Sequence, residues 1–278
     1  MSALAPERPS PAAPAPARRG APRRRGAPPL WALAGAGWLL AYVAVFAGGQ
    51  RFSTAYLDYG WQLVPWEVLT DDVLGSVWYL HIQPPLWNLA LGGTATLSPF
   101  PDAGTLQVLQ ACFGFALAAL LADLLRRLDV RPVLALGLAL AASLNPEVLR
   151  GAFEPTYELP VAAGLALVVR ASVRAVQRPS TRTLLAVAGA TTAVVLTRSL
   201  YHPVWAIAVV AGVWLVTRLR WRVLAAALAV PLVLVGAWMA KNEALYGRAT
   251  LSSWVGMNLQ RSTIPVLPAG DLAAMLDA

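Results

Sequence analysis

Seven apolar runs, with clusters of arginine in three of the six connections between them, constrain the fold of this chain more than any other feature. The runs span residues 30–48, 105–125, 132–146, 158–177, 183–197, 202–217 and 223–240. A helix needs about 20 predominantly apolar residues to cross a bilayer. Only 13% of the 278 residues are charged, whereas soluble domains have about 25%. We therefore predict an all-α polytopic membrane protein with about seven transmembrane helices, and exclude an ordinary cytosolic enzyme.

Arginine sets the expected orientation. The connections Arg126–Arg131, Arg170–Arg182 and Arg218–Arg222 are basic, as is the tail of residues 1–29. The positive-inside rule assigns such segments to the cytoplasm, and seven spans bring all four to that side. The tail is rich in Pro, Ala and Arg and has no apolar periodicity, so we expect a disordered basic cytoplasmic tail. Its arginines are then a topology anchor, and we expect no nucleic-acid partner despite the net charge of +8.

The opposite, outer face receives the long connections and most of the acids. The outer segments under this topology are 51–104, 145–158, 199–203 and 241–278. Residues 84–98 are apolar, but counting them as a further span would invert the orientation of everything downstream. We therefore expect them to form an interfacial helix within the long first outer loop. Residues 30–240 are interpreted as one transmembrane module, and 241–278 as an outer C-terminal segment that is either complete or truncated.

Three acids of the outer segments are candidates for catalysis. Asp58 lies among aromatic residues soon after the first span, where a carboxylate suits a general base. Asp72 follows Asp71, and this pair either caps a helix or holds a divalent cation beside a phosphate. Glu154 precedes a proline, which favours an extended or turn conformation. For Asp58 and Glu154 the alternative is a solvated loop acid without a catalytic role.

Basic and polar side chains at the outer ends of the spans are candidates for binding a phosphate. His81 and Gln83 belong to the string HIQPPLW, in which two prolines fix a turn and then begin a helix. An intramembrane or interfacial arginine is costly unless it meets an anion or reaches the headgroups. The full set of candidates is His81, Gln83, Arg198, His202, Lys241 and Arg261. The alternatives are an interfacial kink at His81 and arginines that extend to lipid headgroups.

Two observations narrow the function class further. Apart from Glu158, the first residue of its run, Asp123 is the single acid within the apolar runs, and it lies near the inner end of its own run. Ion-coupled transporters usually carry ionisable groups near the midplane of the membrane, so this distribution argues against one. The single cysteine, Cys112, excludes a disulfide framework and a cysteine-based zinc site. The sequence assigns no certain cofactor, and a divalent cation at the outer acids remains an alternative.

The order of these motifs resembles that of the C-type (GT-C) integral-membrane glycosyltransferases, which include protein O-mannosyltransferases and the aminoarabinose transferase acting on lipid A. The strings WYLHIQPPLWN, FEPTY, RSLYHPVW and SSWVGMNLQ are similar to a bacterial branch of that superfamily, over about residues 30–261. Asp58 matches the acid after the first span, and Glu154 matches the second-loop acid. Members often carry an Asp-Glu pair where this chain has Asp58 and Tyr59, so Asp72 stays an alternative base.

The resemblance implies a function as well as a fold. It implies an inverting transfer of a sugar from a polyprenyl-phosphate donor to a hydroxyl of a glycan, lipid or protein acceptor. The site would face the outside of the plasma (inner) membrane, with the N-terminus in the cytoplasm. Two other functions remain open, a flippase or transporter for lipid-linked sugars and a non-catalytic scaffold that recruits envelope enzymes through its basic tail.

Overall fold

The computed structural model describes residues 29–60, 63–99 and 102–254, and these fold into twelve α-helices without a strand. The all-α prediction is therefore confirmed. The helices are α1 Leu30–Ala47, α2 Tyr56–Tyr59, α3 Trp66–Asp71, α4 Val73–Trp78, α5 Leu86–Leu97, α6 Asp102–Arg127, α7 Pro132–Ser143, α8 Pro146–Gly151, α9 Glu158–Gln177, α10 Thr181–Thr197, α11 Pro203–Thr217 and α12 Trp221–Tyr246. The predicted basic tail and Arg261 lie outside the described residues.

Four of these helices are long and apolar enough to cross a membrane. They are α1, α6 (from Ala103), α9 and α12. The helices α7, α10 and α11 are also apolar, but they have only 12, 17 and 15 residues. Each of the seven apolar runs thus forms a helix. Membrane crossing is supported by length and composition for four of them and stays a prediction for the other three.

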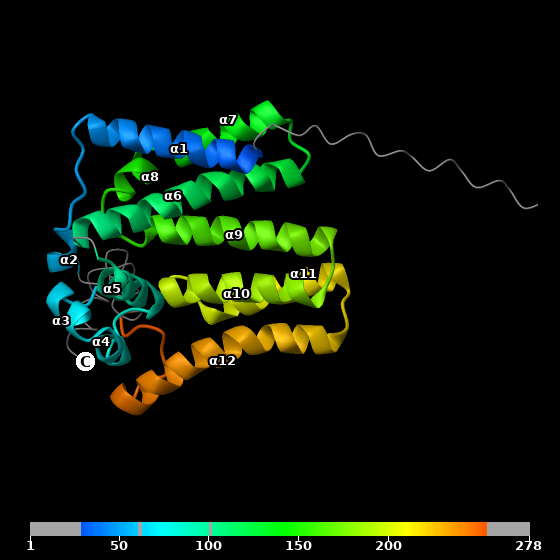
Figure 1. Cartoon of the computed structure of the whole chain (residues 1–278). Coiled ribbons are helices and arrows are strands. Elements are labelled where there is room, and N and C mark those ends of the chain that lie inside the picture. The colour runs from blue at the N-terminus through cyan, green and yellow to red at the C-terminus, as the bar shows by residue number, and fades with distance from the viewer. Residues whose placement is uncertain (1–28, 61–62, 100–101, 255–278) are drawn as a thin grey trace, which may run out of the picture.

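The long helices lie side by side in one bundle (Figure 1). Helix α6 packs against α1, α7 and α9, and α10 packs against α9, α11 and α12. The connections that join α6 to α7, α9 to α10 and α11 to α12 all lie at the same end of the bundle (Figure 1). These are the three arginine-rich connections that were expected to share one side, and their assignment to the cytoplasm stays a prediction.

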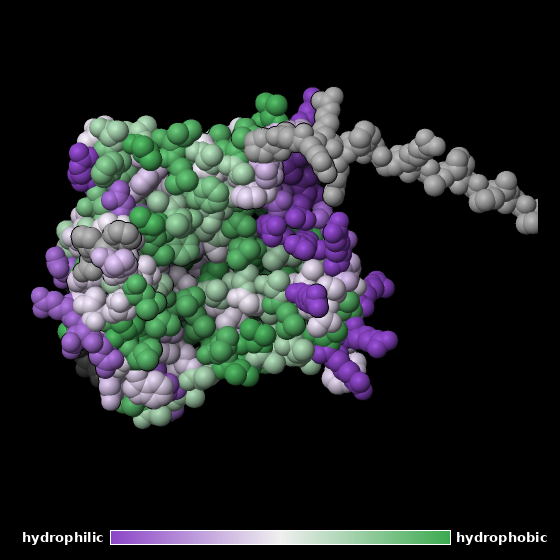
Figure 2. Space-filling model, viewed as in Figure 1, coloured by the Kyte–Doolittle hydropathy of each residue, from purple (hydrophilic) through white to green (hydrophobic). Residues whose placement is uncertain are grey.

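Short helices occupy the opposite end of the bundle. The segment predicted as a long first loop holds α2, α3, α4 and α5, and α8 lies at the same end (Figure 1). Helix α5 packs against α3, α4 and α6 rather than crossing the bundle. On the visible face, hydrophobic side chains gather between the two ends and hydrophilic ones concentrate at them (Figure 2). This pattern matches a protein whose middle faces lipid.

Aromatic packing joins the first helices of the bundle. Trp38 is fully buried, stacks on Tyr42 and donates a hydrogen bond from Nε1 to the carbonyl of Ser143 at 3.2 Å. Tyr42 in turn stacks on Phe153, with the ring centroids 4.5 Å apart. A Cβ atom at Gly114 would lie 2.0 Å from the Trp38 ring. Only glycine therefore lets α6 approach the Trp38 ring this closely.

Candidate functional site

The end of the bundle that carries the short helices also carries a cavity of about 460 Å³ with charged side chains in its lining. Glu154 and Glu158 line it together with Glu147 and Arg150 of α8. Arg150 and Glu147 are highly exposed and form an ion pair with 2.7 Å between Arg150 Nη2 and Glu147 Oε2. Glu154 is partly buried and forms no ion pair with any other described residue. The cavity therefore combines a partly sheltered carboxylate with room for a polar ligand.

The backbone that carries Glu154 is held by a buried amide of α6. Gln110 is fully buried and donates from Nε2 to the carbonyls of Glu154 at 2.8 Å and Thr156 at 2.6 Å. On the other side, the Trp87 indole donates to the carbonyl of Pro155 at 3.2 Å. These bonds fix the turn between α8 and α9. Gln110 is not among the residues predicted from the sequence, although an amide side chain inside an apolar run was a signal for it.

Arg198, a predicted phosphate ligand, lies close to this turn. Its guanidinium is 3.8 Å from a carboxylate oxygen of Glu158 and lies over the ring of Tyr157, 4.7 Å from the centroid. Burial raises the pKa of Tyr157 to about 12, and the positive charge of Arg198 opposes that rise. Because the pair with Glu158 is long and partly exposed, the guanidinium keeps donors available for an anion.

Asp58 lies on α2, close to the same turn. Tyr56, two residues earlier, lines the cavity of Glu154. The preceding segment is joined to the end of the α8 region by a bond from the amide of Ser53 to the carbonyl of Phe153 at 2.8 Å. The side chain of Asp58 is exposed. The structure thus brings the helix of Asp58 to the cavity, with Glu154 lining it.

Asp72 lies at a different cavity, also of about 460 Å³, which Asp71 and His81 line as well. Its carboxylate accepts a hydrogen bond from the amide of Gly75 at 2.9 Å and so caps α4. This is the capping role that the sequence left open for the Asp71–Asp72 pair. The structure therefore separates Asp72 from Glu154, and the residues proposed to share one site line two cavities.

Lys241 has partners inside the protein. It is buried near the end of α12, and its ammonium donates to the carbonyls of Trp78 at 3.0 Å and Leu80 at 2.6 Å. The same ammonium lies 3.6 Å from the centroid of the Trp238 ring. Among the described residues no carboxylate pairs with it. The predicted phosphate ligand thus anchors the segment before HIQPPLW to α12.

The chain after Lys241 continues the same anchor. Tyr246 donates from its hydroxyl to the carbonyl of Tyr79 at 2.5 Å, and its ring lies 4.5 Å from that of His81. The amide of Ser253 donates to the carbonyl of His81 at 2.9 Å, and Ser252 donates to the carbonyl of Ile82. Five consecutive carbonyls, from residue 78 to residue 82, are therefore bound by residues of the segment 241–253.

The remaining predicted ligands are also engaged in local or cross-chain contacts. His81 shares a hydrogen bond of 3.0 Å between Nδ1 and the hydroxyl of Ser253. Gln83 is buried and accepts from the hydroxyl of Ser199 at 3.3 Å. His202 is exposed and caps α11, with its Nδ1 accepting from the amide of Val204 at 3.3 Å. Gln83 is thereby joined to the residue that follows Arg198, whereas His202 serves its own helix.

Two apolar cavities adjoin these polar groups. One of about 250 Å³ lies among α5, α6, α9 and α10 and is lined by Trp87, Pro160 and Thr197. The other, of about 880 Å³, lies between α5 and α6, and Ala90 lines both. The segment from Glu154 to Pro160 therefore contributes to the cavity of Glu154 at one end and to an apolar one at the other. This arrangement suits a ligand with a polar head and an apolar chain.

Neither a metal-binding cluster nor a similarity to known proteins identifies the function of this site. Within the described ranges, no group of three or more His, Cys, Asp or Glu side chains is placed to hold a metal ion. Comparison of the chain with protein-family models, curated proteins and solved structures finds no match. The function is therefore inferred from the geometry of this end of the bundle and from the order of the sequence motifs.

Proposed function

We propose that this chain is a membrane glycosyltransferase that moves a sugar from a polyprenyl-phosphate donor to an acceptor hydroxyl on the outer face of the membrane. One observation carries the proposal. A cavity lined by Glu154 lies beside the Arg198–Glu158 pair, at the end of an apolar bundle opposite its arginine-rich connections. A general base and a phosphate-binding cation are the two groups that this transfer requires.

Glu154 is our first choice for the base, and Asp58 is the second. Glu154 lines the cavity and its backbone is fixed by Gln110, whereas Asp58 is exposed on the adjacent helix. The carboxylate takes the proton of the acceptor hydroxyl while the oxygen attacks the anomeric carbon. The bond between that carbon and the phosphate oxygen breaks, and polyprenyl phosphate leaves with its electron pair. Inversion at the anomeric carbon follows from this single displacement.

Arg198 supports the leaving phosphate in this proposal. Negative charge grows on the phosphate as the bond breaks, and a positioned cation stabilises it most in a partly desolvated site. Lys241 and His81 then act by fixing residues 78–82, since the Lys241 ammonium and Nδ1 of His81 already have hydrogen-bond partners in the protein. The apolar cavities that Trp87 and Ala90 line are suited to the first isoprene units of the donor.

The test is turnover by the purified full chain in lipid nanodiscs. Polyprenyl-phosphate sugars with a radioactive sugar are supplied with an extract of envelope acceptors, and released polyprenyl phosphate is measured. Replacing a general base typically lowers the rate by about 10²–10⁴-fold. We expect that loss for Glu154→Gln, with normal folding judged by gel filtration.

Glu147→Gln is the matched control, since Glu147 lines the same cavity but forms an exposed ion pair with Arg150. We expect turnover close to wild type for this variant. A loss of turnover in Asp58→Asn but not in Glu154→Gln would show that Asp58 of α2, rather than Glu154, is the base. In a parallel assay with the chain in closed liposomes, transport of a labelled lipid-linked sugar across the bilayer without its consumption would replace the proposal with a flippase. Binding of envelope enzymes that needs residues 1–25 but not the outer acids would favour a scaffold.

A further inference from the structure

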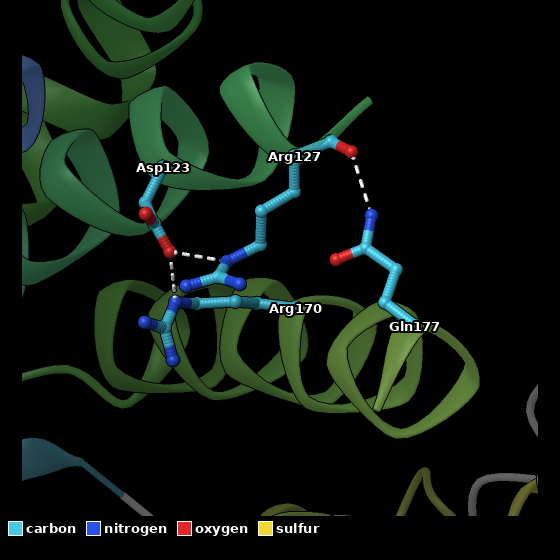
Figure 3. Close-up of polar contacts among 4 residues, drawn as sticks. All are labelled: Asp123, Arg127, Arg170 and Gln177. Carbon is cyan, nitrogen blue, oxygen red and sulfur yellow. Dashed lines mark hydrogen bonds and ion pairs between the residues drawn. The ribbon is translucent and has the colours of Figure 1, made fainter. Parts of the chain in front are cut away.

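The arginine-rich end of the bundle contains a cluster of three charged side chains, Asp123, Arg127 and Arg170, that has no role in the proposed function. Asp123 of α6 accepts two hydrogen bonds on the same oxygen, Oδ2 (Figure 3). One comes from Nε of Arg127 at 2.7 Å, and the other comes from Nε of Arg170 of α9 at 2.5 Å. Two guanidinium groups from two helices thus share a single carboxylate, and the cluster keeps one net positive charge.

Most donors of these two arginines remain available. A guanidinium has five N–H donors, and in this cluster only those on Nε have partners among the described residues. The three side chains are each about one-quarter exposed, with 24–25% of the side-chain surface accessible. The two arginine side chains are therefore partly accessible to a ligand at the surface. A planar fork of donors of this kind matches the oxygens of a phosphate.

The cluster is held in place by the helices that carry it. Gln177 of α9 donates from Nε2 to the carbonyl of Arg127 at 2.7 Å, which joins the ends of the two helices (Figure 3). The shared carboxylate of Asp123 then fixes the relative positions of the two guanidinium groups. A ligand meets a site that is already ordered, so less conformational entropy is lost on binding.

The position of the cluster along α6 and α9 favours a lipid headgroup over a free phosphate ion as the ligand. Arg127 is the last residue of α6, and Arg170 is seven residues before the end of α9, or about 10 Å at 1.5 Å per residue. Headgroup layers are about 5–8 Å thick on each side of the hydrocarbon. On α9, the apolar side chains of Leu167 and Val169 beside Arg170 are exposed. Because Arg127 ends α6 and exposed apolar side chains flank Arg170 on α9, we place the cluster where the headgroups of a surrounding bilayer would begin.

The surroundings of the cluster are strongly basic. The connections Arg126–Arg131, Arg170–Arg182 and Arg218–Arg222 contain Asp129 as their single acid. Such an end attracts anionic lipids, at roughly 1 kcal/mol for each basic residue near the surface. Most of these arginines are exposed and have no hydrogen-bond or ion-pair partner among the described residues, although Arg126 donates to the carbonyl of Val130. Arg127 and Arg170 differ because Asp123 orients them.

We propose that Arg127 and Arg170, oriented by Asp123, form a specific binding site for the phosphate of an anionic phospholipid in the leaflet at this end of the bundle. The phosphate oxygens accept from the terminal nitrogens of both arginines, and the acyl chains lie against α6 and α9. The site is distinct from the cavity of Glu154 and does not depend on the proposed transferase activity.

The test is lipid binding by the full chain in detergent, measured by native mass spectrometry during titration with phosphatidylglycerol. Phosphatidylcholine with the same acyl chains and inorganic phosphate are titrated in parallel. We expect phosphatidylglycerol to bind more tightly than phosphatidylcholine. We also expect Arg127→Gln and Arg170→Gln each to weaken its binding about five-fold.

The matched control is Arg174→Gln with Arg178→Gln, which removes two exposed arginines from the end of α9 without touching Asp123. Equal weakening by this control would reduce the site to a diffuse basic surface and overturn the proposal. Equal binding of the two lipids, or competition by inorganic phosphate at the lipid's own concentration, would also overturn it. If the glutamine variants do not fold, Arg170→Lys is the deciding variant. Lysine keeps the positive charge but lacks the planar set of N–H donors of a guanidinium. Unchanged binding of phosphatidylglycerol by this variant would contradict the proposal.

Discussion

Lys241 on α12 and Leu80 before the HIQPPLW string are joined by a hydrogen bond of 2.6 Å across 161 positions of sequence. A second bond from the same ammonium reaches the carbonyl of Trp78 at 3.0 Å. Tyr246, Ser252 and Ser253 donate hydrogen bonds to the remaining carbonyls of residues 78–82. The segment that introduces α5 is therefore attached to the last long helix of the bundle.

Removing this ammonium is expected to loosen the attachment. Lys241→Met leaves two carbonyls without their donor, at a cost of about 1–3 kcal/mol for each buried group that stays unsatisfied. We expect a lower thermal unfolding temperature in detergent and faster proteolysis between α4 and α5. Glu243→Gln is the control, since Glu243 is exposed on the same helix. Equal stability of Lys241→Met and wild type would show that the anchor contributes little.

The close approach of α6 to Trp38 gives a second prediction. In Gly114→Ala the new methyl group would lie 2.0 Å from the indole ring, so one of the two must move. Overpacking of this kind costs about 1–3 kcal/mol. Gly137→Ala is the matched control, because nothing lies within 4 Å of a Cβ at that helical position. We expect thermal unfolding to shift down for Gly114→Ala and to stay unchanged or rise for Gly137→Ala.

The helices were the part of the fold that the sequence could predict. The apolar run 158–177 has the bounds of α9, and the run 30–48 differs from α1 by one residue at its end. Hydropathy is a local property, and Pro132 and Pro203 mark two helix beginnings directly. The capping role of Asp72 was predicted as an alternative for the same reason, since its partner Gly75 is three residues away.

The site was harder to predict because its contacts are distant in sequence. The partners of Lys241 lie 161 and 163 positions earlier, and no local pattern specifies them. A lysine after an apolar run therefore suggested a phosphate ligand, whereas the structure gives it backbone carbonyls. Gln110 was missed for a related reason, because its partners Glu154 and Thr156 follow 44 and 46 positions later.

Tyr157 provides a prediction on alkaline pH. Its folded-state pKa of about 12 lies above the ordinary value of 10, because burial disfavours the phenolate. The folded state thus favours the neutral phenol, and this contribution to stability is complete below pH 10. It is lost as the pH rises from about 10 through 12. We expect Tyr157→Phe to lessen the fall of the unfolding temperature over this range, as measured by thermal scans at each pH.

Arg198→Gln tests the cause of that titration. The guanidinium lies 4.7 Å from the Tyr157 centroid and lowers the pKa of the phenol, so its removal is expected to raise that pKa further. The readout is the ultraviolet difference titration of tyrosinate, with the Tyr157→Phe curve subtracted. A lower pKa in Arg198→Gln would contradict the contact.

Single cysteines test which end of the bundle faces outward. Glu67 is exposed on α3 among the short helices, and Arg178 is exposed after α9 at the arginine-rich end. The native Cys112 is first replaced by serine, because it is exposed and would react. With a membrane-impermeant maleimide on intact cells, we expect labelling of Glu67→Cys and none of Arg178→Cys until the cells are opened. Labelling of Arg178→Cys alone on intact cells would place the cavity of Glu154 in the cytoplasm, where the proposed transfer at the outer face cannot occur.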